Sequence, residues 1–244
     1  MSEVLAVIPA RGGSKGIPRK NLALLFDHPI LAYAAAAAQQ AELVTRVVCT
    51  TDDKEIAAMA VQYGVEVPFL RSPELAQDQT LDLPVFQDTL QWLAENENYR
   101  PDIVVQLRPT SPIRFPGQVD HAVRMLLINP EASAVRTVCL APNNPFKMWR
   151  IVAEPEGKNP VMEPFATVTG IAEPYNHPHQ GLPQVWWQTG TIDGTRPDII
   201  VNGSMTGPKI VPLRMEARYA IDIDTPLSLQ VAELVMQDLN CIRP

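Results

Sequence analysis

The start of the chain contains a loop whose composition suits phosphate binding. An apolar run, residues 4–8, leads into the loop, where Gly12 and Gly13 are adjacent. Glycine has no Cβ, so the backbone there is free to take positive φ and bring N–H groups against an anion. The ten residues from 11 to 20 also contain four cations that would offset the charge of the anion: Arg11, Lys15, Arg19 and Lys20.

Two aspartates near the other end of the chain complement this loop. Asp222 and Asp224 alternate in the run AIDIDT, residues 220–225, which we expect to be a strand. Alternate residues of a strand share a face, with Cα atoms roughly 6.5–7 Å apart, and one divalent cation bridges carboxylates at that spacing. The two features predict nucleotide chemistry with Mg²⁺ held by Asp222 and Asp224. The alternative is a structural pair of Asx turns that leads into Pro226.

The glycine loop differs from the two common phosphate-binding fingerprints. The spacing G-x-x-x-x-G-K-[ST] of a P-loop does not fit residues 12–16, and the G-x-G-x-x-G pattern of dinucleotide-binding proteins is missing. The loop is therefore predicted to bind a nucleotide in a different way.

The elements that position these residues alternate between apolar strands and helices over the first 140 residues. Strands rich in Val and Ile that alternate with helices predict an α/β fold with a mostly parallel central sheet and helices on both faces, Rossmann-like, with ligands at the carboxyl ends of the strands. The expected helices are 30–41, 54–62, 83–95, 118–127 and 227–239. The expected strands include 4–9, 46–51, 65–70, 102–107, 133–138, 185–192, 198–201, 209–213 and 219–223.

A proline-rich stretch interrupts this alternation. Residues 142–183 contain eight prolines and show weak periodicity, so we expect an insertion of extended segments and loops that serves as a lid or a dimer arm. The whole chain, 1–244, is predicted to be a single nucleotidyltransferase domain that includes this insertion.

The bulk composition excludes several functional classes. A net charge of −7 over 244 residues argues against a nucleic-acid surface. No apolar run is long enough to span a bilayer and no signal peptide precedes the first strand, so a cytoplasmic protein is expected. Three distant cysteines, Cys49, Cys139 and Cys241, are interpreted as buried apolar residues.

Four motifs, in this order, resemble the acylneuraminate cytidylyltransferase family, the CMP-sialic acid synthetases and their relatives. They are PARGGSKGIPRKN (9–21), FLRSPELAQDQT (69–80), RPTSPIR (108–114) and DIDTP (222–226). The resemblance spans nearly the whole chain. It implies CTP and a 2-keto sugar acid as substrates, a homodimer, and Asp222, Asp224 and Lys20 as catalytic residues.

The resemblance also implies which residues contact each substrate. The nucleotide contacts are assigned to Arg11, Gly12, Gly13, Ser14, Lys20, Asn21, Arg71, Thr110 and Ser111. The sugar-acid contacts are assigned to Arg108, Lys147 and Gln188.

The chain departs from the family pattern near the sugar site. Arg108 replaces the glutamine that often precedes Pro-Thr-Ser-Pro, and Arg108 is suited to bind a carboxylate or a phosphate with two hydrogen bonds. Asp193 stands at an aromatic position, and His179 at a position where arginine is frequent. The identity of the sugar acid is therefore left open.

Two residue assignments have structural alternatives. Thr51 or Asp52 is expected to cap the helix that follows, and Arg71 has the alternative of an ion pair with Glu74 or Asp78.

The predicted reaction is attack of the anomeric hydroxyl of the sugar acid on the α-phosphate of CTP, which gives a CMP-sugar and pyrophosphate. The alternatives are a nucleotidylyltransferase that uses another nucleotide and a sugar phosphate, and a non-catalytic nucleotide-sugar sensor.

Overall fold

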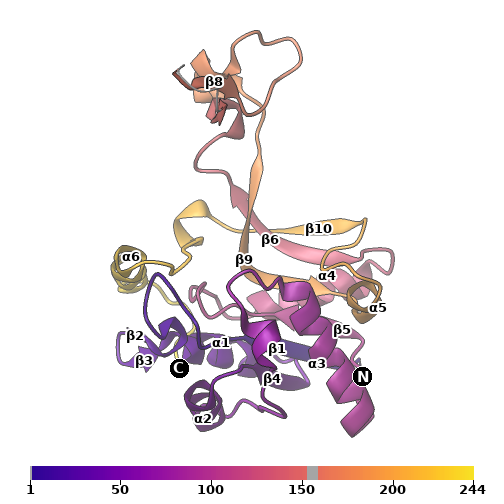
Figure 1. Cartoon of the computed structure of the whole chain (residues 1–244). Helices are drawn as coiled ribbons and strands as arrows, with labels where there is room; N and C mark the ends of the chain where they lie inside the picture. Colours follow the sequence, from indigo (N-terminus) through magenta and orange to yellow (C-terminus); the bar gives the residue numbers. More distant parts are fainter. Residues whose placement is uncertain (1, 153–158) are drawn as a thin grey trace. The chain divides into compact units, whose positions relative to one another are not determined.

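A mixed sheet organises the chain. The computed structural model describes residues 2–152 and 159–244. Within these residues the main sheet has six strands in the spatial order β10, β6, β9, β5, β1, β4 (Figure 1). The strands are β1 (Val4–Pro9), β4 (Arg46–Thr50), β5 (Ile103–Gln106), β6 (Ala134–Leu140), β9 (Trp186–Thr195) and β10 (Ile210–Arg214). β1 is parallel to both β4 and β5, and β10 is parallel to β6, whereas β9 is antiparallel to β5.

Helices cover both faces of this sheet because successive side chains of a buried strand point to opposite faces. Ala6 and Ile8 of β1 contact a cluster that includes apolar residues of α1, α2 and α4. Leu5 and Val7 contact the opposite cluster, to which α3 and α5 contribute. The predicted fold class, α/β with a mostly parallel central sheet and helices on both faces, is confirmed.

The five helices expected from periodicity are present. They are α1 (Ile30–Gln39), α2 (Lys54–Gln62), α3 (Asp82–Glu97), α4 (Gln118–Ile128) and α6 (Pro226–Met236). The cap of α2 was misplaced by one or two residues. Asp53 is the N-cap, and its side chain accepts hydrogen bonds from the N–H groups of Glu55 and Ile56, so the expectation of Thr51 or Asp52 was wrong.

Three expected strands are not strands in the structure. Residues 65–70 form only isolated bridges, at Glu66 and Leu70. Residues 197–201 form the short helix α5 (Pro197–Val201), because Pro197 provides the fixed φ that suits a first helical turn. Residues 219–223 follow a 3₁₀ turn and run irregularly. The strand expected to carry Asp222 and Asp224 is therefore absent from the described chain.

The chain divides into two compact units. The larger comprises residues 1–138 and 188–244, and the smaller comprises residues 139–187. The smaller unit contains the proline-rich stretch and an antiparallel hairpin, β7 (Trp149–Val152) and β8 (Val161–Pro164).

A hydrophobic cluster joins the two ends of the larger unit. Ile17 of the glycine loop and Ile223, between the two aspartates, belong to the same buried cluster, together with Ala232 and Met236 of α6. The N–H of Ile223 also donates to the carbonyl oxygen of Thr110, at 2.7 Å. These contacts hold residues 222–224 in place without strand pairing.

The backbone at Gly16 lies very close to the backbone at Asp224. A Cβ added at Gly16 would overlap the main-chain oxygen of Asp224, whereas a Cβ at Gly13 would meet no atom within 4 Å. The glycine at position 16 is therefore required by a close approach of two backbones.

We expect Gly16→Ala to lower the free energy of unfolding by about 1–3 kcal/mol, since the loop or residues 222–224 must move to relieve the overlap. Urea denaturation checks this value, with Gly13→Ala as the matched control that should change it by less than about 0.5 kcal/mol. Equal stability of the two variants would contradict the close approach.

Candidate active site

The glycine loop and the two aspartates lie next to each other. Lys20 Nζ is 2.5 Å from Asp224 Oδ1, and these two residues are 204 positions apart in the sequence. Asp222 receives a side-chain hydrogen bond from Thr110 at the end of the β5 segment. The structure therefore brings together Lys20, Thr110, Asp222 and Asp224, four residues that the sequence analysis assigned to the site.

The environment of Asp222 raises the pKa of its carboxyl above the usual value. The main cause is desolvation by surrounding protein atoms, although the residue keeps a solvent-exposed surface. The charge of Asp224 adds to the increase, while the Thr110 hydrogen bond and the charges of Lys20 and Arg108 oppose it. A cation bound between Asp222 and Asp224 would offset the repulsion between them.

A cavity of about 310 Å³ opens beside this junction, entirely within the larger unit. Six residues predicted from the sequence line it: Arg11, Lys20, Asn21, Arg71, Arg108 and Thr110. Asp78 and Asp82 also line it. The cavity thus combines four cationic side chains with two carboxylates in one concave surface.

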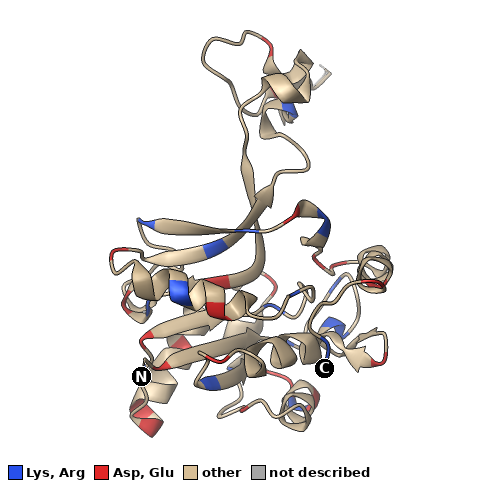
Figure 2. Cartoon of the chain, turned by 180° about the vertical axis from the view of Figure 1, so that it is seen from behind, with Lys and Arg blue, Asp and Glu red and all other residues tan. Residues whose placement is uncertain are grey.

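All four cations of the glycine loop have carboxylate partners, and that of Lys20 is Asp224. Arg11 and Lys15 both pair with Asp78, at 3.0 and 2.5 Å. Arg19 turns instead to Asp53 and Glu55 on α2, at 3.0 Å from each. Acidic and basic residues are interspersed on the ribbon of the larger unit (Figure 2). An anion that enters the cavity must therefore exchange with these internal partners.

The glycines of the loop act differently from the expectation. Neither Gly12 nor Gly13 has positive φ. The N–H of Gly12 donates to Asp52 Oδ1 at 2.9 Å, and a Cβ at Gly12 would lie 2.9 Å from the side chain of Asp53. The positive φ that the sequence analysis allowed for is not adopted, and Gly12 is instead in contact with the turn after β4.

Arg71 is buried and is held by the main chain. Its Nη2 donates to the carbonyl oxygen of Thr50 at 2.6 Å, its Nε to Thr50 Oγ1 at 3.2 Å, and its Nη1 to the carbonyl oxygen of Leu75 at 3.3 Å. Desolvation by burial lowers the pKa of Arg71. Among the described residues, the ion pair with Glu74 or Asp78 that the sequence left open is not formed.

Four other predicted nucleotide contacts do not line the cavity. They are Gly12, Gly13, Ser14 and Ser111. Ser111 is buried, and its N–H donates to the carbonyl oxygen of Arg108. Asn21 does line the cavity, and its side chain donates to the carbonyl oxygen of Arg11, which holds the loop in place.

The three residues predicted to contact the sugar acid lie in different surroundings. Arg108 lines the cavity and donates from Nη2 to Asp82 Oδ2 at 2.7 Å. Gln188 donates to Asp193 Oδ2 at 3.1 Å. Lys147 belongs to the smaller unit, where its Nζ donates to the carbonyl oxygen of Tyr175 at 3.2 Å.

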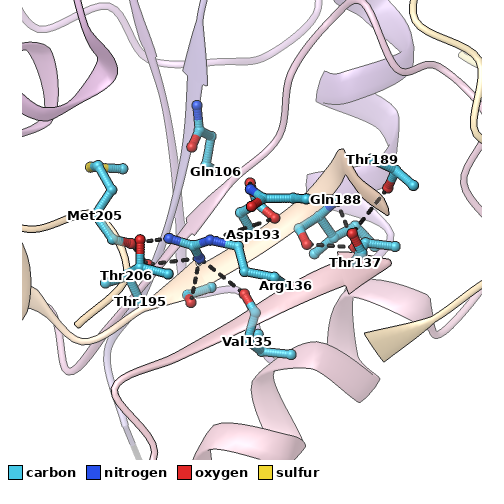
Figure 3. A network of polar contacts seen from close by, with 12 residues as sticks. Gln106, Val135, Arg136, Thr137, Gln188, Thr189, Asp193, Thr195, Met205 and Thr206 are labelled. Atoms are coloured by element: carbon cyan, nitrogen blue, oxygen red, sulfur yellow. Dashed lines mark hydrogen bonds and ion pairs between the residues drawn. The ribbon is translucent and has the colours of Figure 1, made fainter. Parts of the chain in front are cut away.

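A buried polar network surrounds Arg136 in the sheet (Figure 3). Arg136 of β6 donates from Nη1 to the carbonyl oxygens of Val135 and Gly194 and to Thr195 Oγ1, each at 3.0 Å. Its Nε lies 3.9 Å from Asp193 Oδ1. Desolvation by burial raises the pKa of Asp193, and the charges of Arg136 and Arg108 oppose this increase.

Arg114 fixes the turn that carries Arg108 and Thr110. It is fully buried and donates to the carbonyl oxygens of Thr191 and Arg108, at 2.9 and 2.8 Å. Burial lowers the pKa of Arg114 to about 9, so the guanidinium stays charged at neutral pH. The sequence analysis assigned no role to Arg136 or Asp82, named Asp78 only as an alternative partner of Arg71, and included Arg114 only as part of a motif, because the fold and not the local sequence brings their partners to them.

Comparisons with known proteins identify the family of this chain. A family model described as "Cytidylyltransferase" matches residues 5–165. The CMP-N,N'-diacetyllegionaminic acid synthase of Legionella pneumophila is 33% identical over 96% of this chain and 96% of its own length. The N-acylneuraminate cytidylyltransferase of Escherichia coli is 36% identical over 51% of this chain and 28% of its own length.

A solved structure supports the fold alone. CMP:2-keto-3-deoxy-manno-octonic acid synthetase, complexed with CTP, superposes with a TM-score of 0.70 at 18% identity, over 98% of this chain and 100% of that protein. No helix in the described part of the chain is long and apolar enough to cross a membrane. From the sequence matches, this chain is a nucleotidyltransferase and belongs to the acylneuraminate cytidylyltransferase family.

Proposed function

We propose that this enzyme activates a nonulosonic acid, a nine-carbon 2-keto sugar acid, by transferring CMP from CTP to its anomeric hydroxyl. The observation that carries the proposal is the contact between Lys20 and Asp224, at 2.5 Å, beside a cavity lined by cations. This contact supports the proposal, because it joins the glycine loop to the segment that contains both carboxylates. A cytoplasmic location is part of the proposal, because CTP is supplied there.

The nucleotide is assigned to the end of the cavity formed by Arg11, Lys20 and Arg71. Arg11 and Lys20 have side chains that are 32% and 18% exposed, so both remain accessible to a phosphate. Arg71 is held by three hydrogen bonds to protein oxygens and supplies a fixed positive charge. Charges that are already fixed cost little reorganisation when negative charge moves during the reaction.

Asp222 and Asp224 are suited to bind Mg²⁺. The described residues contain no group of three or more His, Cys, Asp or Glu side chains able to hold a metal. Mg²⁺ often binds through one or two carboxylates together with substrate phosphates and water, which suits a two-carboxylate site beside a triphosphate. When bound, Mg²⁺ would neutralise phosphate charge and help hold the triphosphate in line.

The protein residues then have distinct roles in the transfer. Lys20 and Arg11 bind the triphosphate, and Asp222 is held in position by the hydrogen bond from Thr110. Arg108 orients the acceptor so that its anomeric hydroxyl faces the α-phosphorus. The bond from that oxygen to phosphorus forms while the bond to pyrophosphate breaks, and the hydroxyl proton leaves to solvent. Positioning and electrostatic stabilisation supply most of the rate increase in reactions of this kind.

The acceptor class rests on the relatives whose names state a product or substrate. The Legionella relative is named for diacetyllegionaminic acid, and a relative from Campylobacter jejuni, 37% identical over 45% of this chain, is named for pseudaminic acid. Both names refer to sugar acids. A carboxylate-bearing acceptor also suits a cavity that contains Arg108.

A pyrophosphate-release screen tests the proposal. We expect turnover only when CTP is combined with a nonulosonic acid, in a panel of CTP, UTP, GTP and ATP against sialic, legionaminic and pseudaminic acids and sugar phosphates. Turnover of a sugar phosphate with another nucleotide would replace the proposal by the alternative nucleotidylyltransferase. Tight CTP binding without pyrophosphate release in any pairing would favour a non-catalytic sensor.

We also propose that two copies of the chain associate through the smaller unit. Ile151, Met162 and Phe165 on or beside the β7–β8 hairpin are 72%, 60% and 54% exposed. A two-stranded hairpin by itself is marginally stable in water, and exposed apolar side chains on it favour burial against a partner. A second copy of the chain is the partner that the family resemblance implies.

Light scattering after size-exclusion chromatography measures the mass in solution. We expect the intact protein to be a dimer, and Ile151→Glu combined with Met162→Glu to give a monomer, since burying two carboxylates at an apolar interface is unfavourable. Ile128→Glu is the control, because Ile128 is 75% exposed on α4 of the larger unit. A monomeric wild-type protein would overturn the proposed dimer.

A further inference from the structure

Asp82 lies at the point where three elements of the cavity meet. It is the first residue of α3, and its Oδ2 accepts hydrogen bonds from Arg108 Nη2 at 2.7 Å and from Gln106 Nε2 at 2.9 Å. The start of a helix carries partial positive charge, which stabilises a carboxylate there. Asp82 is therefore a fixed hydrogen-bond acceptor in the wall of the cavity.

Arg108 is held in place from two other sides. A Cβ at Gly190 would lie 2.9 Å from Arg108 Nη1, and Gly190 has a φ of +69°, so the guanidinium lies directly against the backbone of β9. The carbonyl oxygen of Arg108 accepts a hydrogen bond from the buried Arg114. The main chain of Arg108 is thus anchored behind the cavity while the guanidinium faces it.

Most of the hydrogen-bonding capacity of Arg108 is unused. Among the described residues, its guanidinium donates only to Asp82, although a guanidinium has five N–H groups. The side chains of Arg108 and Asp82 are each 38% exposed in the cavity wall. The pair therefore presents free donors to a ligand in a fixed orientation.

The charge of Asp82 decides which anion fits these donors. A phosphate dianion at Arg108 would lie beside the Asp82 carboxylate and be repelled by it. A carboxylate carries one negative charge and matches the planar edge of a guanidinium with two hydrogen bonds. Arg11, Lys20 and Arg71 together bring three positive charges to the cavity, which is more favourable for the several charges of a triphosphate than the single guanidinium of Arg108.

We propose that Asp82 is a positioning residue for the acceptor: it holds the guanidinium of Arg108 so that the free N–H groups bind the carboxylate of the sugar acid. This inference rests on the proposed function and deepens it. Asp82 acts through Arg108 and touches neither the nucleotide nor the reacting atoms. The pair also discriminates against sugar phosphates.

Steady-state kinetics of Asp82→Ala and Asp82→Asn test this role. We expect Asp82→Ala to raise KM for the sugar acid by about tenfold, while KM for CTP changes by less than about twofold. Asp82→Asn keeps an acceptor for Arg108 and should give a smaller increase, and it provides a second test if Asp82→Ala folds poorly. Glu95→Gln, near the other end of α3, is the control and should leave both KM values unchanged.

A double-mutant cycle with Arg108→Gln separates positioning from direct binding. If Asp82 acts through Arg108, Asp82→Ala should have little further effect on KM for the sugar acid in the Arg108→Gln background. An equal effect in both backgrounds, or an equal rise in KM for both substrates, would overturn the inference and leave the proposed function intact. A wild-type enzyme that turns over sugar phosphates instead of sugar acids would overturn both.

Discussion

The structure of the site depends on one hydrophobic contact between distant parts of the chain. Ile17 and Ile223 share a buried cluster with residues of α6, and this cluster brings the glycine loop to the segment that carries Asp222 and Asp224. Removing apolar side chains from water is the main favourable term that can hold two such segments together. The polar contact between Lys20 and Asp224 follows from this arrangement, because exposed ion pairs contribute little stability themselves.

The charges around the cavity are matched within the protein before a substrate binds. Asp78 holds Arg11 and Lys15, Asp224 holds Lys20, and Asp82 holds Arg108. Each carboxylate keeps a cationic side chain in a defined place. The same carboxylate also competes with an anionic ligand for that cation. Binding is then an exchange of partners, in which a triphosphate replaces carboxylates at one end and a sugar acid uses the remaining donors of Arg108 at the other.

Much of this arrangement could be predicted from the sequence, and the failures have physical causes. The helices and the sheet were predictable because the apolar periodicity of residues 30–128 is local and strong. The loop cations and the two aspartates were predictable as a site because glycines, cations and alternating carboxylates are unusual in combination. The strand expected at 219–223 was wrong because burial of Ile223 and its bond to Thr110, both long-range contacts, replace strand pairing.

Other parts of the site have no local signature. Asp82 was a single acidic residue at a helix start, and only the fold places it beside Arg108 and Gln106. Arg136 lies in an apolar run and Arg114 in a polar turn, and their partners include the main-chain oxygens of Gly194 and Thr191, 58 and 77 residues away. The central claim is that the two chain ends form one site. It is tested by measuring how Mn²⁺ changes the affinity for CTP and how CTP changes the affinity for Mn²⁺, after correction for their association in solution. The account predicts that each ligand tightens the other by the same factor of about ten or more, and that Asp222→Ala and Asp224→Ala abolish this coupling while CTP alone still binds. Unchanged coupling in both variants would contradict the account.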